Sequence, residues 1–332
     1  MIPVPDHVLQ TLAQKYAIEP ASLEKFAGGE EGNDGVVYAY PHQGKRRLLK
    51  ILPIPHEQQR QGLFRLEERL RLMRCMGDGG ARVAFPLNSP INRLYETHEF
   101  TEYLWVGYIM NLLPGKTPRG DRWDPAFFCA WGELIGLTHR LSTQYPSWEA
   151  SNDPQTGEAL LTWQEEWDDF YRWCPDEDVK QKWLEMRARL EKLPRSRQDF
   201  GFIHNDAHLW NLLVDETTIT LLDFDVANHH WFMTDIAIAC QSVLFDLTGG
   251  MNRPLVDQSK LREFVRIFME GYLREYPLDP ARLEQLDLFI AYRRTLLFIV
   301  MHGWISSQPE MHAGWKRMIL EEPEVAGRGW YR

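Results

Sequence analysis

The chain has 332 residues, which is enough for one large domain or two moderate ones. Its 37 basic and 47 acidic side chains leave a formal charge of −10, which opposes non-specific binding to nucleic acid and to anionic membranes. The cysteines are widely spaced with no C-x-x-C pair, and no stretch reads as a signal peptide or membrane span. We therefore expect a cytoplasmic protein, with a neutral or cationic partner favoured over an anionic one.

A glycine-rich turn follows the first elements of the chain. Residues 6–16 have the apolar spacing of a short amphipathic helix, residues 20–26 lead into a possible strand, and residues 36–40 alternate like another. Between these two, glycines would let backbone N–H groups approach phosphate oxygens, so Gly29 and Gly32 are candidate nucleotide-binding residues. An ordinary flexible turn explains them at least as well, because the turn carries three acidic residues and lacks G-x-G-x-x-G spacing.

Lys50 is a lone cation within the next predicted strand, residues 46–52, which Pro53 and Pro55 are expected to end. A lysine in a strand usually points to solvent. Kinase-like folds, however, place the lysine that pairs with the nucleotide phosphates two strands after a glycine turn. We therefore predict that Lys50 anchors these phosphates.

Residues 56–76 carry leucines and a methionine at helical spacing, which predicts a helix with one buried stripe. Glu67 lies at the edge of that stripe and could form the ion pair that orients Lys50, with Glu68 and Glu57 as rivals. A solvated glutamate among the arginines of this helix is an almost equally good explanation.

The following strands are expected to complete a small antiparallel sheet of about five strands. They are predicted at residues 83–87, 93–95 and 103–112. The subsequent L-L-P-G-K-T imitates the end of a P-loop, but Met110 stands where that motif needs glycine. We interpret residues 111–116 as a hinge, at which backbone groups of Met110 and Leu112 could hydrogen-bond an adenine edge. The predicted domains are an N-terminal lobe, residues 1–110, and a C-terminal lobe, residues 117–332.

The second lobe is predicted to be mainly helical. Helices are expected at residues 125–141, 161–172, 177–193, 255–276, 280–305 and 314–320. The second of these carries Glu165, Glu166, Asp168 and Asp169, and such a run is usually a solvated face. As a hypothesis, it could instead form an acidic lip that attracts an ammonium substrate, in which case charge reversal of Glu166 and Asp169 should raise KM.

The central stretch, residues 202–237, contains H-N-D-A-H-L-W-N-L-L-V-D and then L-L-D-F-D. Transfer of a γ-phosphoryl group needs a carboxylate beside the attacking hydroxyl, which Asp206 could supply, and oxygen ligands for Mg²⁺ on the nucleotide. Asn211 and Asp223 are the metal-ligand candidates, because an amide oxygen and a carboxylate suit a hard cation. Asp225 could add a second contact to the metal or cap the following loop.

Supporting roles are expected for two further residues of this stretch. His204 is predicted to pack and hydrogen-bond beneath the loop, and Asp235 to accept hydrogen bonds from loop N–H groups at a helix N-terminus. His139, near the end of the first predicted helix of the second lobe, is also read as structural.

A zinc hydrolase is a competing interpretation, because His204, Asp206 and His208 spell H-x-D-x-H with His229 and His230 downstream. It would leave Asn211, the D-F-D strand and the lysine strand as coincidences. We therefore rank it well below phosphoryl transfer.

These motifs resemble the aminoglycoside phosphotransferase and choline kinase family over nearly the whole chain. The resemblance implies an α+β, bilobal protein-kinase-like fold with a small antiparallel-sheet N-lobe and a mainly helical C-lobe. It implies Asp206 as catalytic base, Asn211 and Asp223 as metal ligands, and Lys50 as phosphate anchor, with ATP or GTP as donor. The acceptor would be a hydroxyl of a small molecule such as an aminoglycoside, an amino alcohol or a hydroxy amino acid.

The chain departs from the family pattern in two places. The usual H-G-D is H-N-D, and Trp210 replaces the small residue before Asn211, which could narrow the space near the metal and change which substrate fits. Protein-kinase activity is less favoured, because the segment between Asp225 and Asp235 is short and lacks A-P-E. A nucleotide-binding pseudokinase without turnover is the remaining alternative, which the complete set of catalytic and metal-ligand candidates opposes.

Overall fold

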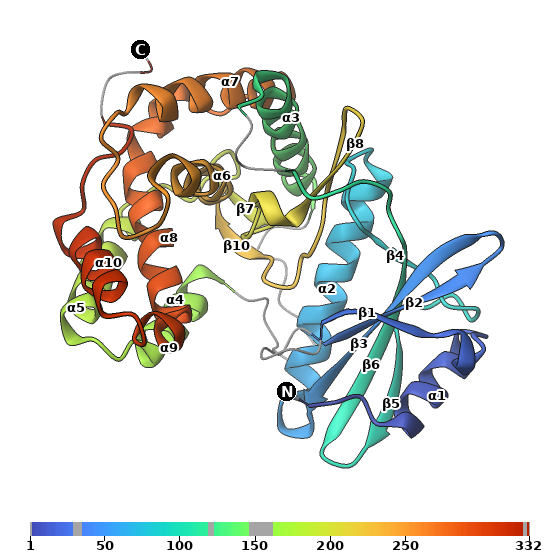
Figure 1. The fold of residues 1–332 in the computed structure, drawn as a ribbon. Helices are drawn as coiled ribbons and strands as arrows, with labels where there is room; N and C mark the ends of the chain where they lie inside the picture. The colour runs from blue at the N-terminus through green and yellow to red at the C-terminus, as the bar shows by residue number, and fades with distance from the viewer. Residues whose placement is uncertain (1, 29–34, 119–122, 146–161, 328–330, 332) are drawn as a thin grey trace. The chain divides into compact units, whose positions relative to one another are not determined.

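The computed structural model describes residues 2–28, 35–118, 123–145, 162–327 and 331 (Figure 1). These residues fall into two compact units, of which the first extends to Gly115 and the second begins at Lys116. Gly29 and Gly32 lie outside the described residues. A hinge at residues 111–116 between lobes 1–110 and 117–332 stays a prediction.

The first unit is built on a six-stranded antiparallel sheet (Figure 1). The strand order is β1 (Glu24–Gly28), β2 (Val36–His42), β3 (Lys45–Pro55), β6 (Tyr103–Asn111) and β4 (Pro86–Leu87), with β5 (Glu96–Phe100) also pairing with β6. Helices α1 (Asp6–Lys15) and α2 (Gln59–Asp78) accompany the sheet. Val8 and Leu12 of α1 form a buried core with Leu49 and Ile51 of β3. Because side chains alternate along a strand, Lys50 projects to the face away from α1.

Two strand predictions in this unit were wrong. Strand β3 continues through Pro53 to Pro55, because its pairing with β2 ends at Ile51 and only β6 accompanies it further. Proline lacks an N–H group but is tolerated on such an unpaired edge. Residues 93–95 are not a strand either. Ser89 N–H donates to the carbonyl of Arg93 at 2.7 Å in a turn, and β5 begins afterwards.

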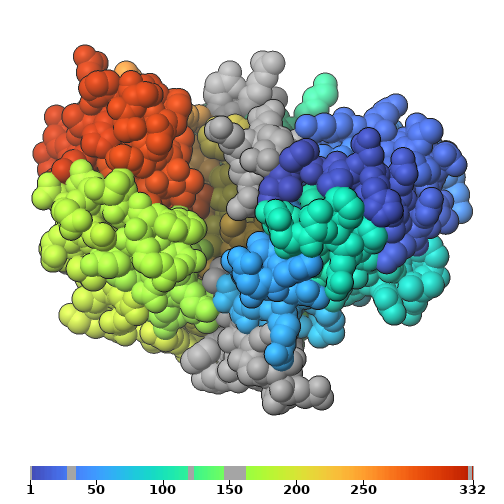
Figure 2. Space-filling view, turned by 90° about the horizontal axis from the view of Figure 1, so that it is seen from below, coloured from blue at the N-terminus to red at the C-terminus, as the bar shows by residue number. Residues whose placement is uncertain are grey.

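The second unit is mainly helical, with two short antiparallel strand pairs (Figure 1). The strand pairs are β7 (Phe200–Ile203) with β10 (Asn228–Trp231), and β8 (Leu212–Asp215) with β9 (Thr218–Leu221). The helices are α3 (Pro125–Ser142), α4 (Trp163–Trp173), α5 (Glu177–Leu190), α6 (Phe232–Thr248), α7 (Ser259–Glu275), α8 (Leu286–Val300), α9 (His302–Ile305) and α10 (Pro309–Glu321). Helices α5 and α10, far apart in sequence, lie side by side on the face shown in Figure 2.

Glycines allow α3 and α7 to pack backbone against backbone. A Cβ atom on Gly132 of α3 would lie 1.9 Å from the carbonyl oxygen of Phe268, and one on Gly271 of α7 would lie 1.8 Å from that of Cys129. Neither position can accept a side chain without separating the helices. His139 of α3 and Tyr272 of α7 contact each other across the same pair of helices, and His139 also contacts Asp235 in the site described next.

Candidate active site

Two strand pairs bring the predicted catalytic residues together. Strand β7 ends at Ile203, and the loop after it carries Asp206. Asn211 immediately precedes β8, while Asp223 follows β9, so the antiparallel pairing of these strands places both residues at one end of the hairpin. The backbone N–H of Leu222 donates to the carbonyl of Asn211 at 2.8 Å, which closes that end.

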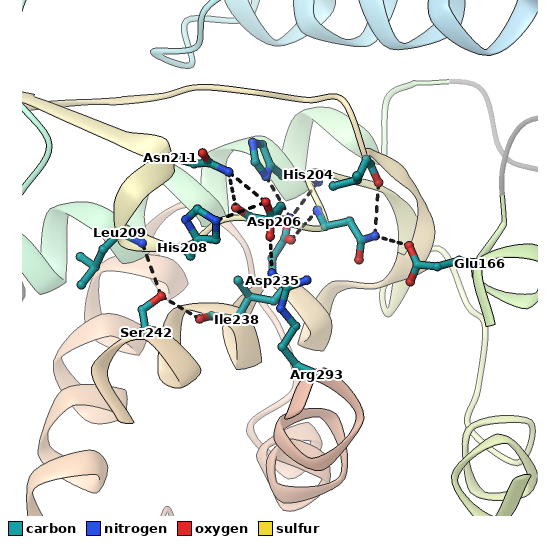
Figure 3. Close-up of polar contacts among 12 residues, drawn as sticks. Glu166, His204, Asp206, His208, Leu209, Asn211, Asp235, Ile238, Ser242 and Arg293 are labelled. Atoms are coloured by element: carbon teal, nitrogen blue, oxygen red, sulfur yellow. Dashed lines mark hydrogen bonds and ion pairs between the residues drawn. The ribbon is translucent and has the colours of Figure 1, made fainter. Parts of the chain in front are cut away.

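The side-chain amide of Asn211 is oriented by Asp206 (Figure 3). Its Nδ2 donates to the backbone carbonyl of Asp206 at 2.9 Å and to Oδ2 of the same residue at 3.1 Å. The amide oxygen of Asn211 therefore points away from Asp206. That oxygen suits a hard divalent cation, as do the carboxylates of Asp223 and Asp225.

Three side chains converge on the carboxylate of Asp206 (Figure 3). Arg293 of α8 forms an ion pair with Oδ1, while His208 lies 3.3 Å and Asn211 3.1 Å from Oδ2. Burial alone would raise the pKa of Asp206, but the Arg293 guanidinium and His208 outweigh it and hold this pKa well below its usual range. Asp206 is therefore ionised at neutral pH.

His204 connects the loop that carries Asp206 to Leu222, the residue before Asp223. Its Nδ1 accepts a hydrogen bond from the backbone N–H of Asp206 at 3.1 Å, and its Nε2 donates to the carbonyl of Leu222 at 2.7 Å. These partners require the neutral ring with the proton on Nε2. Both nitrogens are used, as predicted for a supporting residue.

The arrangement of His204 also argues against the zinc-hydrolase interpretation, since neither of its ring nitrogens is available to a metal. Among the residues that the structure describes, no group of three or more His, Cys, Asp or Glu side chains could hold a metal ion.

Asp235 of α6 accepts hydrogen bonds from the backbone of the loop that carries Asp206, which confirms its predicted role. Its Oδ2 accepts from the backbone N–H of His204 at 3.2 Å, and its Oδ1 accepts from that of Asn205 at 2.8 Å. His139 of α3 contacts Oδ2 through Nε2 at 3.1 Å, and its Nδ1 lies 2.7 Å from the hydroxyl of Tyr272 on α7. The interpretation of His139 as structural is consistent with these buried contacts.

Asn205 has a backbone φ of 64°, in the left-handed region that favours glycine and tolerates asparagine. Its Nδ2 donates to Oε2 of Glu166 at 2.6 Å and to the carbonyl of Val226 at 3.2 Å. Glu166 also accepts from Asn228 at 2.8 Å and from the hydroxyl of Tyr292 at 3.2 Å. Burial raises the pKa of Glu166 to about 7.

The acidic-lip hypothesis for residues of α4 was therefore wrong for Glu166. This side chain is 8% exposed and supports the catalytic loop rather than facing solvent. The helix turns Glu166 inward together with Trp163 and Trp167, because these positions share one face. Asp168 pairs with Arg187 at 2.6 Å, and Asp169 pairs with Arg172.

A cavity of about 590 Å³ lies beside Asp206 within the second unit. Its wall includes Asp206, Glu166, Arg293 and Trp210. Trp210 is 58% exposed, and its ring lies edge-on to those of His208 and Phe245. The base candidate thus borders a space in which a small molecule can bind.

Comparison with known proteins agrees with this geometry. The profile of the phosphotransferase enzyme family matches residues 31–287, which is most of the chain. The chain belongs to this family.

Individual relatives of the phosphotransferase are small-molecule kinases. Amicoumacin kinase of Bacillus subtilis (strain 168) is 28% identical over 329 residues, covering 95% of this chain and 91% of that protein. A solved amicoumacin kinase in complex with AMP-PNP, Ca²⁺ and Ami has a TM-score of 0.82 at 24% identity, covering 96% and 94% of the two chains. A microcompartment-associated aminopropanol kinase has a TM-score of 0.70 at 18% identity, covering 96% and 98%. The expected protein-kinase-like fold and the expected membership of a phosphotransferase family are confirmed.

In the first unit of the phosphotransferase, Lys50 is buried, with 8% exposure, and does not point to solvent. Glu67 accepts hydrogen bonds from Arg71 and, at 3.0 Å, from the hydroxyl of Tyr95. Glu68 is 9% exposed and accepts from Arg71 at 3.0 Å, whereas Glu57 is exposed. Which glutamate serves Lys50 stays a prediction.

The predicted adenine contacts lie at the end of β6. Met110 is a sheet residue that pairs with Leu48 and Pro86. The N–H of Leu112 donates to the carbonyl of Arg46 at 3.3 Å, so its carbonyl is the group better placed for a ligand. The nucleotide-binding role of these residues stays a prediction.

Sequence reasoning missed the contribution of Arg293 to the site. No local motif connects this residue with Asp206. A buried cation on an apolar helix, however, requires an anionic partner, and that was the available signal.

Within the described part of the phosphotransferase, no helix is long and apolar enough to span a bilayer.

Proposed function

We propose that this phosphotransferase moves the γ-phosphoryl group of ATP or GTP to a hydroxyl group of a small molecule that binds in the cavity beside Asp206. The observation that carries the proposal is the ionised Asp206 carboxylate at the cavity wall, with Asn211 at its side. The AMP-PNP, Ca²⁺ and Ami bound in the solved amicoumacin kinase support a nucleotide, a divalent cation and a small acceptor.

Asp206 would orient the acceptor hydroxyl and take its proton. A carboxylate offers about four lone-pair sites, so Asp206 has room for a substrate hydroxyl beside its present partners. Its low pKa makes it a weak base. That suits phosphoryl transfer through a loose transition state, in which positioning and charge stabilisation contribute more than strong proton abstraction.

Mg²⁺ is the proposed metal. Asn211 and Asp223 would hold it, and Asp225 would add a further contact. When bound, the cation would neutralise charge on the nucleotide phosphates. Lys50, helped by Glu67 or a neighbouring glutamate, is proposed to contact the same phosphates, and the turn with Gly29 and Gly32 and the backbone of Met110 and Leu112 to bind the nucleotide.

The net charge of −10 supports an acceptor that is neutral or cationic rather than anionic. A cytoplasmic location is also proposed, and it is supported by the four cysteines, which are all free thiols.

The test measures release of ADP or GDP with Mg²⁺ and a panel of hydroxyl acceptors. Asp206→Asn should lower kcat by about a hundredfold or more, because it removes the carboxylate and keeps the side-chain shape. Asp215→Asn, at an exposed position of β8, is the matched control and should retain full activity.

Nucleotide binding by Asp206→Asn, measured by calorimetry, should remain, which shows that the variant is folded. Tight nucleotide binding by the wild type without turnover on any acceptor would favour a binding module instead. Equal rates for Asp206→Asn and the wild type would contradict the proposal.

A further inference from the structure

The wall of the cavity beside Asp206 is mostly apolar. Phe170 of α4, Phe245 of α6 and Leu297 of α8 contribute to it, together with Met301 and Met311. A volume of about 590 Å³ is within the range of pockets that enclose drug-sized molecules. An acceptor of only a few heavy atoms would leave much of this apolar wall without a contact.

Large apolar side chains at this cavity are also exposed to solvent. Trp210, Val226, Val300 and Trp304 all line it and are 58%, 44%, 57% and 52% exposed. Exposed apolar residues gathered around one cavity indicate a surface that binds an apolar partner. Two of the four are tryptophans, whose flat rings favour stacking against a ring of the ligand.

The charged groups of the cavity offer little to a polycation. Among the described residues that line it, Asp206 and Glu166 are acidic and Arg293 is basic. Arg293 already pairs with Asp206. Glu166 accepts hydrogen bonds from Asn205, Asn228 and Tyr292, and burial raises its pKa to about 7, so much of it is neutral at neutral pH. Several ammonium groups entering this cavity would lose their hydration without gaining carboxylate partners.

Gln241 of α6 supplies one polar anchor. Its side chain lines the cavity and is 3% exposed. Its Nε2 contacts Sδ of Met251 at 2.9 Å, whereas its Oε1 has no hydrogen-bond partner among the described residues. A buried carbonyl oxygen without a donor is costly, so this atom is suited to an N–H or O–H group of a ligand.

We propose that the acceptor is a largely apolar, ring-bearing alcohol that carries at most one positive charge and donates one hydrogen bond to Gln241. This inference rests on the proposed function, because it takes the cavity to be the acceptor site. It deepens that function by separating this chain from enzymes whose acceptors are polycationic aminoglycosides or amino alcohols of a few heavy atoms.

Calorimetric binding without nucleotide tests the pocket independently of turnover. The probes are N-benzoylphenylalaninol, its ester analogue in which oxygen replaces the amide N–H, the polycation kanamycin, and 1-amino-2-propanol. N-benzoylphenylalaninol should bind at least about tenfold more tightly than kanamycin or 1-amino-2-propanol, because only its two phenyl rings can pack against the apolar wall of the cavity. Equal or tighter binding of kanamycin overturns the proposal, and so does failure of N-benzoylphenylalaninol to bind.

Two variants test whether the ligand binds in this cavity. Val300→Asp introduces a carboxylate at its wall and should weaken binding of N-benzoylphenylalaninol about tenfold while strengthening that of kanamycin. Val256→Asp, at a position that is 96% exposed and is not among the residues lining the cavity, is the matched control and should change neither. Trp304→Ser tests the same wall without a new charge if Val300→Asp is unstable. Unchanged binding of N-benzoylphenylalaninol in both Val300→Asp and Trp304→Ser overturns the proposal.

Gln241→Met tests the polar anchor. It keeps the side-chain length and should weaken binding of the amide about tenfold, because the lost bond leaves the ligand N–H without an acceptor. Binding of the ester should not change. Equal losses for both ligands overturn the role of Gln241.

The proposed function and this inference fail in different ways. Preferred phosphorylation of kanamycin over N-benzoylphenylalaninol keeps the phosphotransferase proposal and overturns the apolar acceptor. Tight binding of N-benzoylphenylalaninol without transfer to any alcohol, in the presence of ATP and Mg²⁺, supports the acceptor pocket and contradicts turnover.

Discussion

Arg293 of α8 pairs with Oδ1 of Asp206, the carboxylate that we propose as catalytic base. The two residues lie on separate elements, and both line the same cavity. Asp206 is therefore held by a cation that lines this cavity, while Asn211 holds its other oxygen.

Removing this cation should change the pH dependence of the reaction. In Arg293→Met, burial is no longer outweighed by the guanidinium, so the pKa of Asp206 rises. The acidic limb of the profile of kcat/KM against pH should move upward by about one pH unit or more. Arg293→Lys keeps the charge and should move it less. Superimposable profiles for the wild type and both variants would show that the ion pair does not tune Asp206.

The raised pKa of Glu166 predicts that the free energy of unfolding depends on pH. Its pKa is about 7 in the folded protein against 4.5 for an unperturbed carboxyl, so the folded state binds its proton more tightly. This contribution is fully present below pH 4.5 and is lost as the pH rises to about 7, a change of order 3 kcal/mol. Tyr292 and Arg293 of α8, Asn205 and Asn228 are the groups that face it.

Glu166→Gln resembles the protonated form and should remove that pH dependence. The free energy of unfolding of the wild type minus that of the variant, from urea denaturation at pH 5, 6, 7 and 8.5, should fall with rising pH and level off above 7. A difference that stays constant would contradict the raised pKa.

The bond from Asn205 to Glu166 can be separated from the backbone conformation of Asn205. Asn205→Gly removes the hydrogen bond and suits the φ of 64°, so it should cost about 1–3 kcal/mol through the buried acceptor alone. Asn205→Ala also places Cβ in the left-handed region and should cost about 1–2 kcal/mol more. Combining Asn205→Gly with Glu166→Met, which removes the acceptor as well as the donor, should cost less than the sum of the single changes, and strict additivity would show that the contact carries no energy.

Metal dependence should follow Asp223. Removal of divalent cations with EDTA should abolish turnover, and added Mg²⁺ should restore it. Asp223→Asn should raise the Mg²⁺ concentration for half-maximal activity about tenfold, because the site loses a negative charge. Asp215→Asn lies on the same hairpin and should leave the requirement unchanged. An equal Mg²⁺ requirement in Asp223→Asn would remove this residue from the metal site.

The close contact of α3 and α7 predicts a stability difference between glycines. Gly132→Ala should destabilise the protein by about 3 kcal/mol or more, because its Cβ would meet the backbone of Phe268. Gly303→Ala, in α9 with nothing within 4 Å of the added atom, should be neutral or slightly stabilising. Thermal unfolding of the two variants gives the comparison, and similar melting temperatures would contradict close packing at Gly132.

Local periodicity explains which elements could be predicted from the sequence. The amphipathic helices and most strands carry an apolar pattern that one segment displays by itself. Helix α6 was recognised only at its start, around Asp235, because its side chains are buried from Phe232 to Leu244 and it shows no polar face. Strand β3 was expected to end at its prolines, since an unpaired strand edge is not visible in the sequence.

The same distinction applies to the site. Asp206, Asn211 and Asp223 could be proposed from the sequence because a loop and a hairpin bring neighbours in sequence together. Arg293 and Glu166 come from helices that the fold carries to the loop, and their partners lie far along the chain. Contacts of this kind have no local spacing to reveal them, so Glu166 was misread as a solvent-exposed acid.

The pairing of Asn205 with Glu166 constrains how this site can change during evolution. Glycine at position 205 would leave Glu166 with one donor fewer, and an apolar residue at position 166 would leave the amides of Asn205 and Asn228 without their acceptor. Each single replacement passes through a less stable protein, whereas the joint replacement removes the donor on residue 205 together with its acceptor and leaves only Asn228 and Tyr292 to find other acceptors. In related chains, glycine at the first position should therefore accompany loss of the acid at the second, and the two should vary together.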